Sequence, residues 1–178
     1  MQINLESFYI EPIKNQDAWS LCDFMVANED RLKRYFPKTL ELNLTPDLSK
    51  RFAEQKTKQF QNKEEFLFTL KEKETHQLAG VIYIKDLDWG KKQGEFAYSI
   101  SYTFKGKSLI TKTVNALSKY AFENLGLETL QIIVHKENIP SVKVAENNNF
   151  IWKKTLKKEF TPPNEQPLDM ELYELYKK

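Results

Sequence analysis

The chain has 178 residues, of which 40% are apolar and 13% aromatic, so it is long enough to bury a substantial hydrophobic core. Its 27 basic and 25 acidic side chains give a net charge of +2, and only three residues are arginine. This balance argues against a specific nucleic-acid partner, because arginine supplies most bidentate contacts to phosphate and guanine. The single cysteine, Cys22, excludes an intramolecular disulfide and a cysteine-cluster metal site.

No targeting or membrane signal is visible in the sequence. Met1–Glu6 lacks a basic segment followed by an apolar core, and nowhere do about 18 apolar residues follow one another. We therefore expect a cytoplasmic location and no membrane partner. No repeat, low-complexity segment or linker divides the chain, so we expect one domain over residues 1–178, as a monomer or homodimer.

The first half of the chain mixes strand and helix patterns. Bulky residues at Arg31–Pro37 interrupt the helical periodicity, and Lys85–Lys92 is predicted to be a turn. The predicted elements are, in order, a strand at Phe8–Pro12, helices near Asp17–Ala27 and Pro46–Asn62, and a hairpin of strands Phe66–Leu70 and Leu78–Tyr83.

The second half alternates strands and helices. Its predicted elements are a strand at Glu95–Ile100, a helix carrying Ile110, Val114, Leu117, Ala121 and Leu125 on one face, a strand at Leu130–His135, a short helix from Asn138, and two strands joined around Thr161–Asn164. Hairpins followed by strand-helix-strand-helix predict a mixed sheet with helices on its faces.

The segment Thr103–Thr111 is typical of a phosphate-binding turn between a strand and a helix. The first turn of a helix leaves about four N–H groups without partners, and the helix dipole adds positive charge there. A diphosphate satisfies both. Gly106 lets a ligand approach the backbone, Ser108 keeps the turn open, and Lys105 and Lys107 add charge. An ordinary turn between lysines is the alternative.

A second candidate lies at the short helix after Leu130–His135. Asn138 is predicted as its N-cap, with Pro140 in the first turn, where a missing N–H costs nothing. Ser141 follows about one turn along, at the same end of the helix. Both residues bind a ligand on one interpretation and only cap the helix on the other.

The segment from Glu95 to Phe150 resembles the acetyl-CoA-binding half of the GNAT N-acetyltransferase superfamily, in its RimJ/RimL-type branch. Three pieces carry the resemblance: Glu95–Tyr98, the turn Phe104–Lys107, and Asn138-x-x-Ser141 running to Phe150. Weaker agreement extends over nearly the whole chain. The chain departs from the family pattern at Thr103, Ser108, Lys112 and Asn149, although Asn is the best substitute for Gly in a left-handed helix cap.

The resemblance implies a mixed α/β fold with a central, mostly antiparallel seven-stranded sheet and helices on both faces. Its fourth and fifth strands, at Glu95–Ile100 and Leu130–His135, would run parallel and splay apart, so that the pantetheine arm takes the place of a strand. The implied cofactor-binding residues are Ile100, Ser101 and Tyr102 for the arm, Lys105, Gly106, Lys107, Ser108, Leu109 and Ile110 for the pyrophosphate, and Asn138 with Ser141 on the other side.

The implied reaction is direct transfer of an acetyl group from acetyl-CoA to a primary amine in a ternary complex, without a metal. The acceptor must lose a proton and the departing thiolate must gain one. Glu95 is the candidate base, acting through water, and a solvated edge charge is its alternative. Ser141 is the candidate acid, because the position where many members carry Tyr is here Ala145; a locally bonded hydroxyl is its alternative. His135 is a reserve base.

The acceptor is left open by the sequence. The resemblance favours a protein or peptide α-amine, and a polyamine, an amino acid or an antibiotic amine also fits. Tyr98, Trp89 and Trp152 either line an acceptor channel or belong to the core. Two other classes stay open, a catalytically silent acyl-CoA-binding or regulatory domain and an interaction module of this fold without a ligand.

Overall fold

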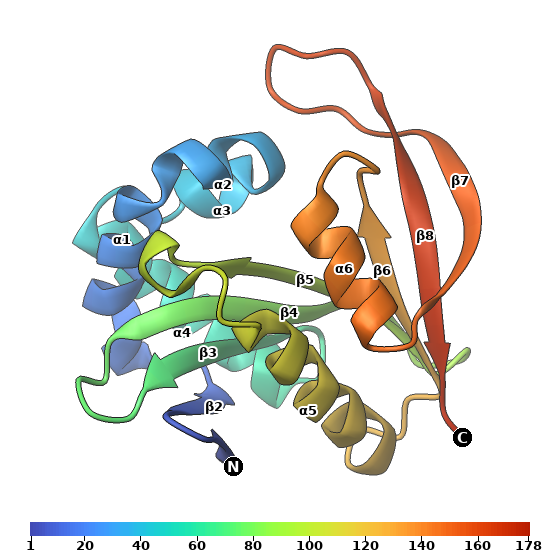
Figure 1. The fold of residues 1–178 in the computed structure, drawn as a ribbon. Coiled ribbons are helices and arrows are strands. Elements are labelled where there is room, and N and C mark those ends of the chain that lie inside the picture. Colours follow the sequence, from blue (N-terminus) through green and yellow to red (C-terminus); the bar gives the residue numbers. More distant parts are fainter. The chain divides into compact units, whose positions relative to one another are not determined.

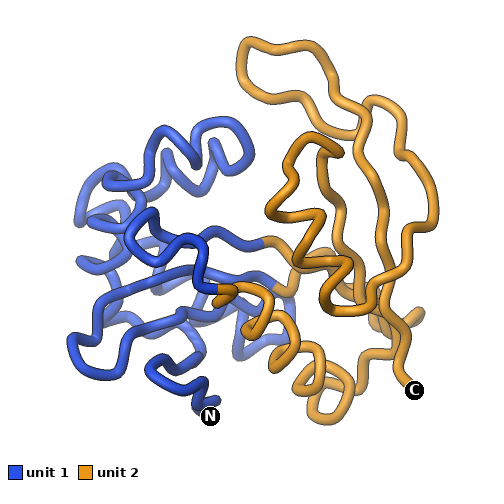
Figure 2. The backbone as a smooth tube through the Cα atoms, viewed as in Figure 1, with its two compact units in different colours: residues 1–83, 98–107 blue, residues 84–97, 108–178 orange.

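The computed structural model describes all residues, 1–178. Eight strands form one hydrogen-bonded sheet in the order β1-β2-β3-β4-β5-β6-β8-β7 (Figure 1). The chain consists of two compact units, residues 1–83 with 98–107 (unit 1) and residues 84–97 with 108–178 (unit 2), as Figure 2 shows. Strands β4 (Leu78–Asp88) and β5 (Gln93–Ile100) belong in part to each unit.

Unit 1 combines antiparallel strands with a group of helices. Strand β2 pairs with β1 on one side and with β3 on the other, in a register that runs from Phe8 opposite Glu72 to Pro12 opposite Phe68. The elements that lie wholly in this unit are β1 (Ile3–Leu5), β2 (Phe8–Pro12), η1 (Asn15–Asp17), α1 (Ala18–Ala27), α2 (Glu29–Tyr35), α3 (Pro37–Glu41), α4 (Pro46–Gln61), β3 (Phe66–Glu72) and η2 (Tyr102–Phe104).

Helix α4 shows how sequence signals position this unit. Thr45 caps its start, with Oγ1 accepting from the Leu48 N–H at 3.3 Å, and Pro46 occupies the first turn. The helix packs against α1 and β3. Phe60 meets the rings of Phe66 and Phe68 edge-on, with ring centroids 4.9 and 5.2 Å away. These contacts join α4 to the buried face of the sheet.

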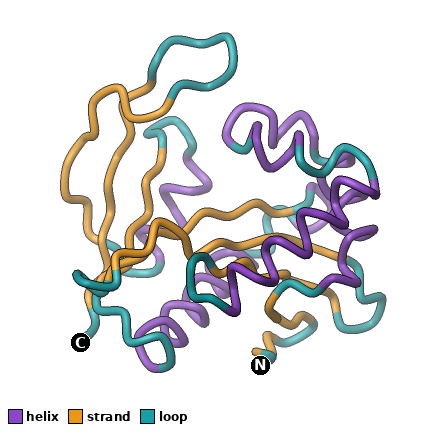
Figure 3. Tube along the Cα trace, turned by 180° about the vertical axis from the view of Figure 1, so that it is seen from behind, coloured by secondary structure: helices purple, strands orange, loops and turns teal.

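Unit 2 is built on a parallel pair and an antiparallel hairpin. Strand β5 runs parallel to β6 (Thr129–Val134), β6 pairs with β8 (Leu168–Tyr176), and β8 pairs with β7 (Ile151–Phe160). Helix α6 (Ile139–Asn147) packs on β6 and on α5 (Leu109–Glu123), and Figure 3 shows α6 beside these strands. Most of the predicted stripe of α5 is buried, because Ile110 is 7% exposed and Val114, Leu117 and Ala121 are fully inaccessible. Leu125, predicted on the same face, is half-buried and follows the end of the helix at Glu123.

The parallel pairing between β5 and β6 is short. Its register runs from Gln93 opposite Thr129 to Phe96 opposite Ile132, whereas β6 continues to Val134. Parallel strands in this position agree with the fold that the sequence predicts. Glu95, opposite Gln131, lies within the last part of the paired stretch.

Strand β7 is an edge of the sheet. It carries four lysines and most of its side chains are exposed. Its pairing with β8 shifts register twice, between Trp152 and Lys154 and between Leu156 and Phe160. Lys158, within the second shift, has a left-handed backbone with φ 50°. The strand therefore departs from a regular, flat edge.

The structure corrects three details of the predicted elements. The sheet has eight strands rather than seven, because β1 is a three-residue strand too short to show alternation. Arg31–Pro37 is largely helical, since Pro37 starts α3 and the break at Phe36 (φ −130°) is a single residue. Lys85–Asp88 continues β4 instead of forming a turn. No helix has both the length and the apolar character needed to cross a membrane.

Candidate functional site

The predicted phosphate turn has an open, uncapped helix start. Gly106 has φ 82°, and a Cβ built there would meet no heavy atom within 4 Å. Ser108, the N-cap of α5, has a left-handed φ of 54°, and its side chain makes no capping hydrogen bond. The first helical bond runs from the Lys112 N–H to the Ser108 carbonyl, at 3.1 Å. The N–H groups of residues 109–111 therefore precede the helical ladder, as an anion site requires.

A buried aromatic ring anchors this turn while its lysines remain exposed. Phe104 is 3% exposed and meets Phe8 edge-on at 5.4 Å. The Lys107 ammonium lies 5.5 Å from the centroid of the Phe104 ring, within the range of a cation–π contact. Lys105 and Gly106 are also exposed. Positive charge thus surrounds an accessible backbone turn.

The backbone before the turn already has partners within unit 1. The Ile100 carbonyl accepts from Arg31 Nη1 at 2.7 Å, and the Tyr102 N–H donates to Asn28 Oδ1 at 3.1 Å. The Ser101 N–H donates to the Ala79 carbonyl at 2.7 Å. A carbonyl oxygen accepts two hydrogen bonds, so the Ile100 carbonyl keeps capacity for a ligand. The predicted contacts of residues 100–102 with a pantetheine arm remain predictions.

Glu95 is the most perturbed carboxyl group of unit 2. Its side chain is 15% exposed, and Lys85 Nζ lies 3.5 Å from Oε1. Burial raises the pKa of Glu95 to about 7; the Lys85 charge opposes this shift and the nearby Asp86 adds to it. A carboxylate with a pKa near neutrality can both take and release a proton at physiological pH, which is what a general base needs.

The two charged neighbours of Glu95 were missed by sequence reasoning, because their segment was predicted to be a turn. Lys85 Nζ is 3.0 Å from Asp86 Oδ2, and Asp86 has a left-handed backbone with φ 49°. Burial alone would lower the pKa of Lys85, but Glu95 and Asp86 together raise it. The sequence signal that could have found them is the turn at Trp89–Lys92, because a hairpin there brings Lys85 and Asp86 close to Glu95 on the next strand.

The start of α6 places Asn138 where the sequence predicts it, without the expected capping bond. Asn138 is the N-cap, yet its side chain makes no capping hydrogen bond; its carbonyl accepts from the Val142 N–H at 3.0 Å. Ser141 is half-buried in the first turn, after Pro140. Ala145, at the position of the family's tyrosine acid, is fully buried. Asn149 adopts the predicted left-handed cap, with φ 62°.

His135 lies between β6 and α6. Its side chain is 7% exposed, Nδ1 has no hydrogen-bond partner, and its carbonyl accepts from the Asn138 N–H at 2.9 Å. A buried imidazole nitrogen without a partner suits the reserve role given to it, and also suits a histidine that is only packed. Cys22 is buried in α1 as a small apolar side chain.

The predicted residues fall into both units. Glu95, Ser108–Ile110, Asn138 and Ser141 belong to unit 2, whereas Ile100–Lys107 belongs to unit 1. Within unit 2, Glu95 lies on β5 and Asn138 follows β6, the parallel neighbour of β5. The aromatic candidates differ in burial: Trp89 and Trp152 are 42% and 54% exposed, so neither is a core residue, and Tyr98 is half-buried.

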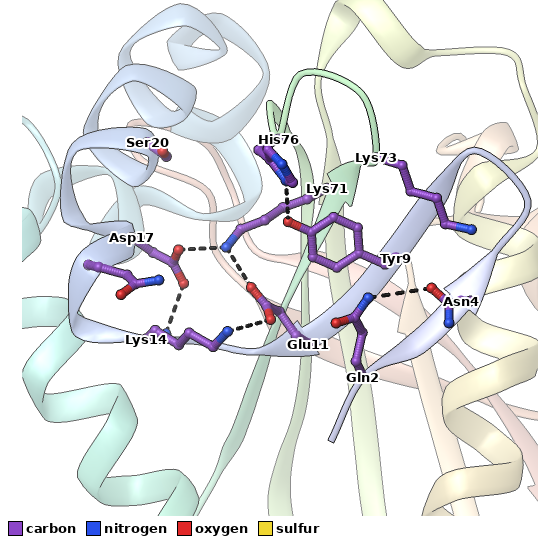
Figure 4. A pocket seen from close by; sticks show the side chains of 11 residues that line it. Gln2, Asn4, Tyr9, Glu11, Lys14, Asp17, Ser20, Lys71, Lys73 and His76 are labelled. Atoms are coloured by element: carbon purple, nitrogen blue, oxygen red, sulfur yellow. Dashed lines mark hydrogen bonds and ion pairs between the residues drawn. The ribbon is translucent and has the colours of Figure 1, made fainter.

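A separate polar pocket of about 550 Å³ lies within unit 1 (Figure 4). At its base, Lys71 Nζ donates to Glu11 at 2.8 Å and to Asp17 at 2.6 Å, and Lys14 Nζ lies 2.5 Å from Glu11. The Tyr9 hydroxyl and His76 Nδ1 are 3.0 Å apart. These groups satisfy one another, so the pocket presents no unpaired charge from them. The structure contains no group of three or more His, Cys, Asp or Glu side chains placed to hold a metal ion.

The family model of the acetyltransferase (GNAT) domain matches residues 8–151. The chain belongs to the GNAT acetyltransferase family. This membership confirms the family and the enzyme class that the sequence predicts.

Two bacterial proteins are similar to this GNAT chain in sequence. "Putative ribosomal N-acetyltransferase YdaF" of Bacillus subtilis is 26% identical over 154 residues, covering 82% of this chain and 79% of YdaF. "Uncharacterized N-acetyltransferase p20" of Bacillus licheniformis is 25% identical over 111 residues, and the match covers 62% of each chain. The chain therefore spans less than two thirds of the length of p20.

Solved GNAT structures share the whole fold. The ribosomal-protein-S5-alanine acetyltransferase of Vibrio fischeri superposes with a TM-score of 0.92 at 21% identity, covering 99% of this chain and 96% of that one. A RimL ribosomal α-N-protein acetyltransferase in complex with coenzyme A has a TM-score of 0.90 at 14% identity and covers 99% and 98%. At these identities the likeness establishes the mixed α/β fold.

Proposed function

We propose that this chain transfers the acetyl group of acetyl-CoA to a primary amine in a ternary complex, and that its acceptor is a protein or peptide α-amine. The observation that carries the proposal is the open turn before α5, with Gly106 at φ 82° and an N-cap side chain that makes no capping bond. This turn offers backbone N–H groups and two lysines to a diphosphate.

The residues fit the cofactor chemistry at each end of the turn. Lys105–Ile110 would hold the pyrophosphate, Ile100–Tyr102 would contact the pantetheine arm, and Asn138 with Ser141 would contact it from α6. The absent side-chain cap at Ser108 supports this assignment, because a self-capped helix would not need an anion. The coenzyme A bound to the RimL relative supports it as well.

The chemistry requires three proton transfers, two away from the acceptor ammonium and one to the departing thiolate. As the amine nitrogen attacks the thioester carbonyl carbon, a C–N bond forms and the C–S bond breaks. The acceptor ammonium loses two protons: Glu95 takes one through water, and the other is lost to solvent. The Ser141 hydroxyl donates a proton to the departing thiolate and is then reprotonated from solvent. The Glu95 pKa of about 7 matches its role as base.

The acceptor class rests on the relatives. YdaF, the Vibrio fischeri protein and the RimL protein carry ribosomal-protein acetyltransferase names. A protein α-amine is accordingly the acceptor we propose, ahead of a polyamine or another small amine. A silent cofactor-binding domain is less favoured, because the chain belongs to an acetyltransferase family and keeps a largely buried carboxylate at Glu95.

The test uses two glycines with similar left-handed backbone conformations. Gly106 and Gly126 have φ 82° and 73°, and a Cβ at either would meet no atom within 4 Å. Alanine at either position should cost on the order of 1 kcal/mol of stability, because both are left-handed. Acetyl-CoA at 100 times its Kd should stabilise the unchanged protein and Gly126→Ala by about 2.7 kcal/mol. Gly106→Ala should lose most of this gain.

Two outcomes would overturn the proposal. The first is no thermal shift of the unchanged protein at millimolar acetyl-CoA. The second is a clear shift without release of CoA thiol in the presence of N-terminal peptides beginning with Ala, Ser or Met, and of spermidine. Thiol release with spermidine but with none of the peptides would overturn only the choice of acceptor.

A further inference from the structure

Asn28 joins helices α1 and α2 and also reaches a loop far away in sequence. It is 2% exposed and is both the C-cap of α1 and the N-cap of α2. Its Nδ2 donates to the Phe24 carbonyl at 2.7 Å, while its Oδ1 accepts from the Tyr102 N–H at 3.1 Å. Because the carbonyl of α1 fixes the amide's donor side, the acceptor side is directed at the loop.

Arg31, one turn along α2, contacts the same loop twice. Its Nη1 donates to the Ile100 carbonyl at 2.7 Å, and its guanidinium carbon lies 4.6 Å from the centroid of the Tyr102 ring. Tyr102 is 51% exposed, so the stacked guanidinium covers an aromatic ring that would otherwise face water. A planar guanidinium can donate and stack at once, which lysine cannot do.

The opposite side of the loop is held by the sheet and the core of unit 1. The Ser101 N–H donates to the Ala79 carbonyl on β4, and Phe104 is buried against Phe8. Residues 100–104 are therefore held between the α1–α2 corner and β4. The exposed turn that follows, Lys105–Ser108, begins at the end of this held segment.

We propose that Asn28 and Arg31 are positioning residues, which hold residues 100–104 so that the following turn receives the diphosphate of acetyl-CoA. This inference rests on the proposed function. Neither side chain is assigned a contact with the reacting atoms, and both act through the backbone of Ile100 and Tyr102. A helix-capping role for Asn28 accounts for its bond to Phe24, but not for its bond to Tyr102.

The cost of a mobile loop follows from binding energetics. A turn that samples several conformations must be ordered when the ligand binds, and this ordering reduces affinity. The loss should fall on binding of the cofactor, because Asn28 and Arg31 contact residues 100–102 and no residue assigned to the acceptor. The expected signature is thus a change in affinity for CoA without a change in KM for the amine.

The experiment compares Arg31→Met, Arg31→Lys and Asn28→Leu with the control Arg51→Met. Arg51 is exposed on α4 of the same unit, so the control removes an arginine that makes none of the contacts to residues 100–104 described above. Calorimetric titration with CoA gives Kd, steady-state assays give KM for each substrate, and hydrogen exchange reports on the Tyr102 amide.

We expect Arg31→Met and Asn28→Leu each to raise Kd for CoA on the order of three- to tenfold, the loss of a hydrogen bond. Arg31→Lys should recover part of this loss, because it keeps a charged donor but not the stacking. Arg51→Met should stay within about twofold of the unchanged protein, because it removes only an exposed charge. Exchange of the Tyr102 amide should accelerate on the order of tenfold in Asn28→Leu, which removes its acceptor.

The outcomes separate this inference from the proposed function. Unchanged Kd for CoA in Arg31→Met and Asn28→Leu, with faster exchange at Tyr102, would overturn the positioning role alone. Equal losses of affinity in Arg31→Met and Arg51→Met would also overturn it, since a general effect of removing positive charge would then explain both. Failure of the unchanged protein to bind CoA would overturn the proposed function and, with it, this inference.

Discussion

Two groups of lysine and carboxylate side chains in this chain shift the pKa of a largely buried glutamate in opposite directions. In unit 1, Lys71 lies between Glu11 and Asp17, and all three side chains are at most 8% exposed. Burial alone would raise the pKa of Glu11, but Lys14 and Lys71 outweigh it and hold this pKa below its usual range. In unit 2, Lys85 is further from Glu95, at 3.5 Å, and shares its charge with Asp86. Burial prevails there, and the pKa of Glu95 rises to about 7.

The difference lies in how completely each carboxylate is compensated. Glu11 accepts from two ammonium groups, so its charged form contributes stability above its unfolded pKa of about 4.5, which is lost as pH falls through the lower folded value. The raised pKa of Glu95 makes its contribution to stability depend on pH in the opposite direction. Its contribution is present below about 4.5 and is lost as pH rises through about 7. At neutral pH the charged form of Glu11 stabilises the fold, whereas ionisation of the largely buried Glu95 lowers stability and leaves a carboxyl group that can bind a proton near pH 7.

The largest effect should come from breaking the compensated group. Lys71→Met leaves Glu11 and Asp17 buried without their shared ammonium, and we expect the free energy of unfolding to fall by about 3–5 kcal/mol. Urea denaturation of the full chain at pH 7 measures this change. The control Lys157→Met removes the exposed pair with Asp169 and should be nearly silent. Equal losses in the two variants would contradict a special role for burial.

Glu95→Gln should separate function from stability in the uncompensated group. We expect kcat to fall by about 10²-fold or more, because a general base is lost, while Kd for CoA changes little. The free energy of unfolding at pH 8 should not fall, since the variant no longer buries a charge. Steady-state assays and denaturation at pH 8 measure the two quantities. An undiminished kcat would remove Glu95 from its role.

A smaller effect should follow from changing only the compensation of Glu95. Lys85→Met removes the one positive charge that lowers its pKa, so the acidic limb of the kcat/KM profile should move upward, by about one pH unit. Asp86→Asn removes a charge that raises this pKa and should move the limb downward. Profiles recorded between pH 5.5 and 9.5, together with carbon-13 titration of the carboxyl group, test both. Parallel shifts in the two variants would show that their charges do not act on Glu95.

Much of the fold was predictable because its signals are local. The burial of Val114, Leu117 and Ala121 followed from their helical spacing, and α4 starts at Pro46 as predicted, where Thr45 and Pro46 are typical of a helix start. The missed elements lack such signals. Strand β1 is held in place by its pairing with β2. Lys85–Asp88 continues β4 through Asp86, whose left-handed backbone is more typical of a turn than of a strand.

Those features of the candidate site that depend on the local backbone were predictable, whereas those that depend on contacts between residues far apart in the sequence were not. The accessible turn at Gly106 was predicted from the sequence of the turn itself, whereas the missing side-chain cap at Ser108 was not. The partners of the preceding segment do not, because Asn28 and Arg31 lie 74 and 69 residues away from the groups that they bind. The environment of Glu95 needed the strand extension at Lys85, which a turn prediction excluded.

Strand β7 also bears on how this protein behaves when concentrated. An exposed sheet edge is a template on which another chain can add a strand, and such additions can propagate into aggregates. Four lysines and two register shifts along β7 oppose this, because like charges would meet across any new pairing and the bulges interrupt a continuous ladder. These four lysines thus act as gatekeepers against self-association at this edge.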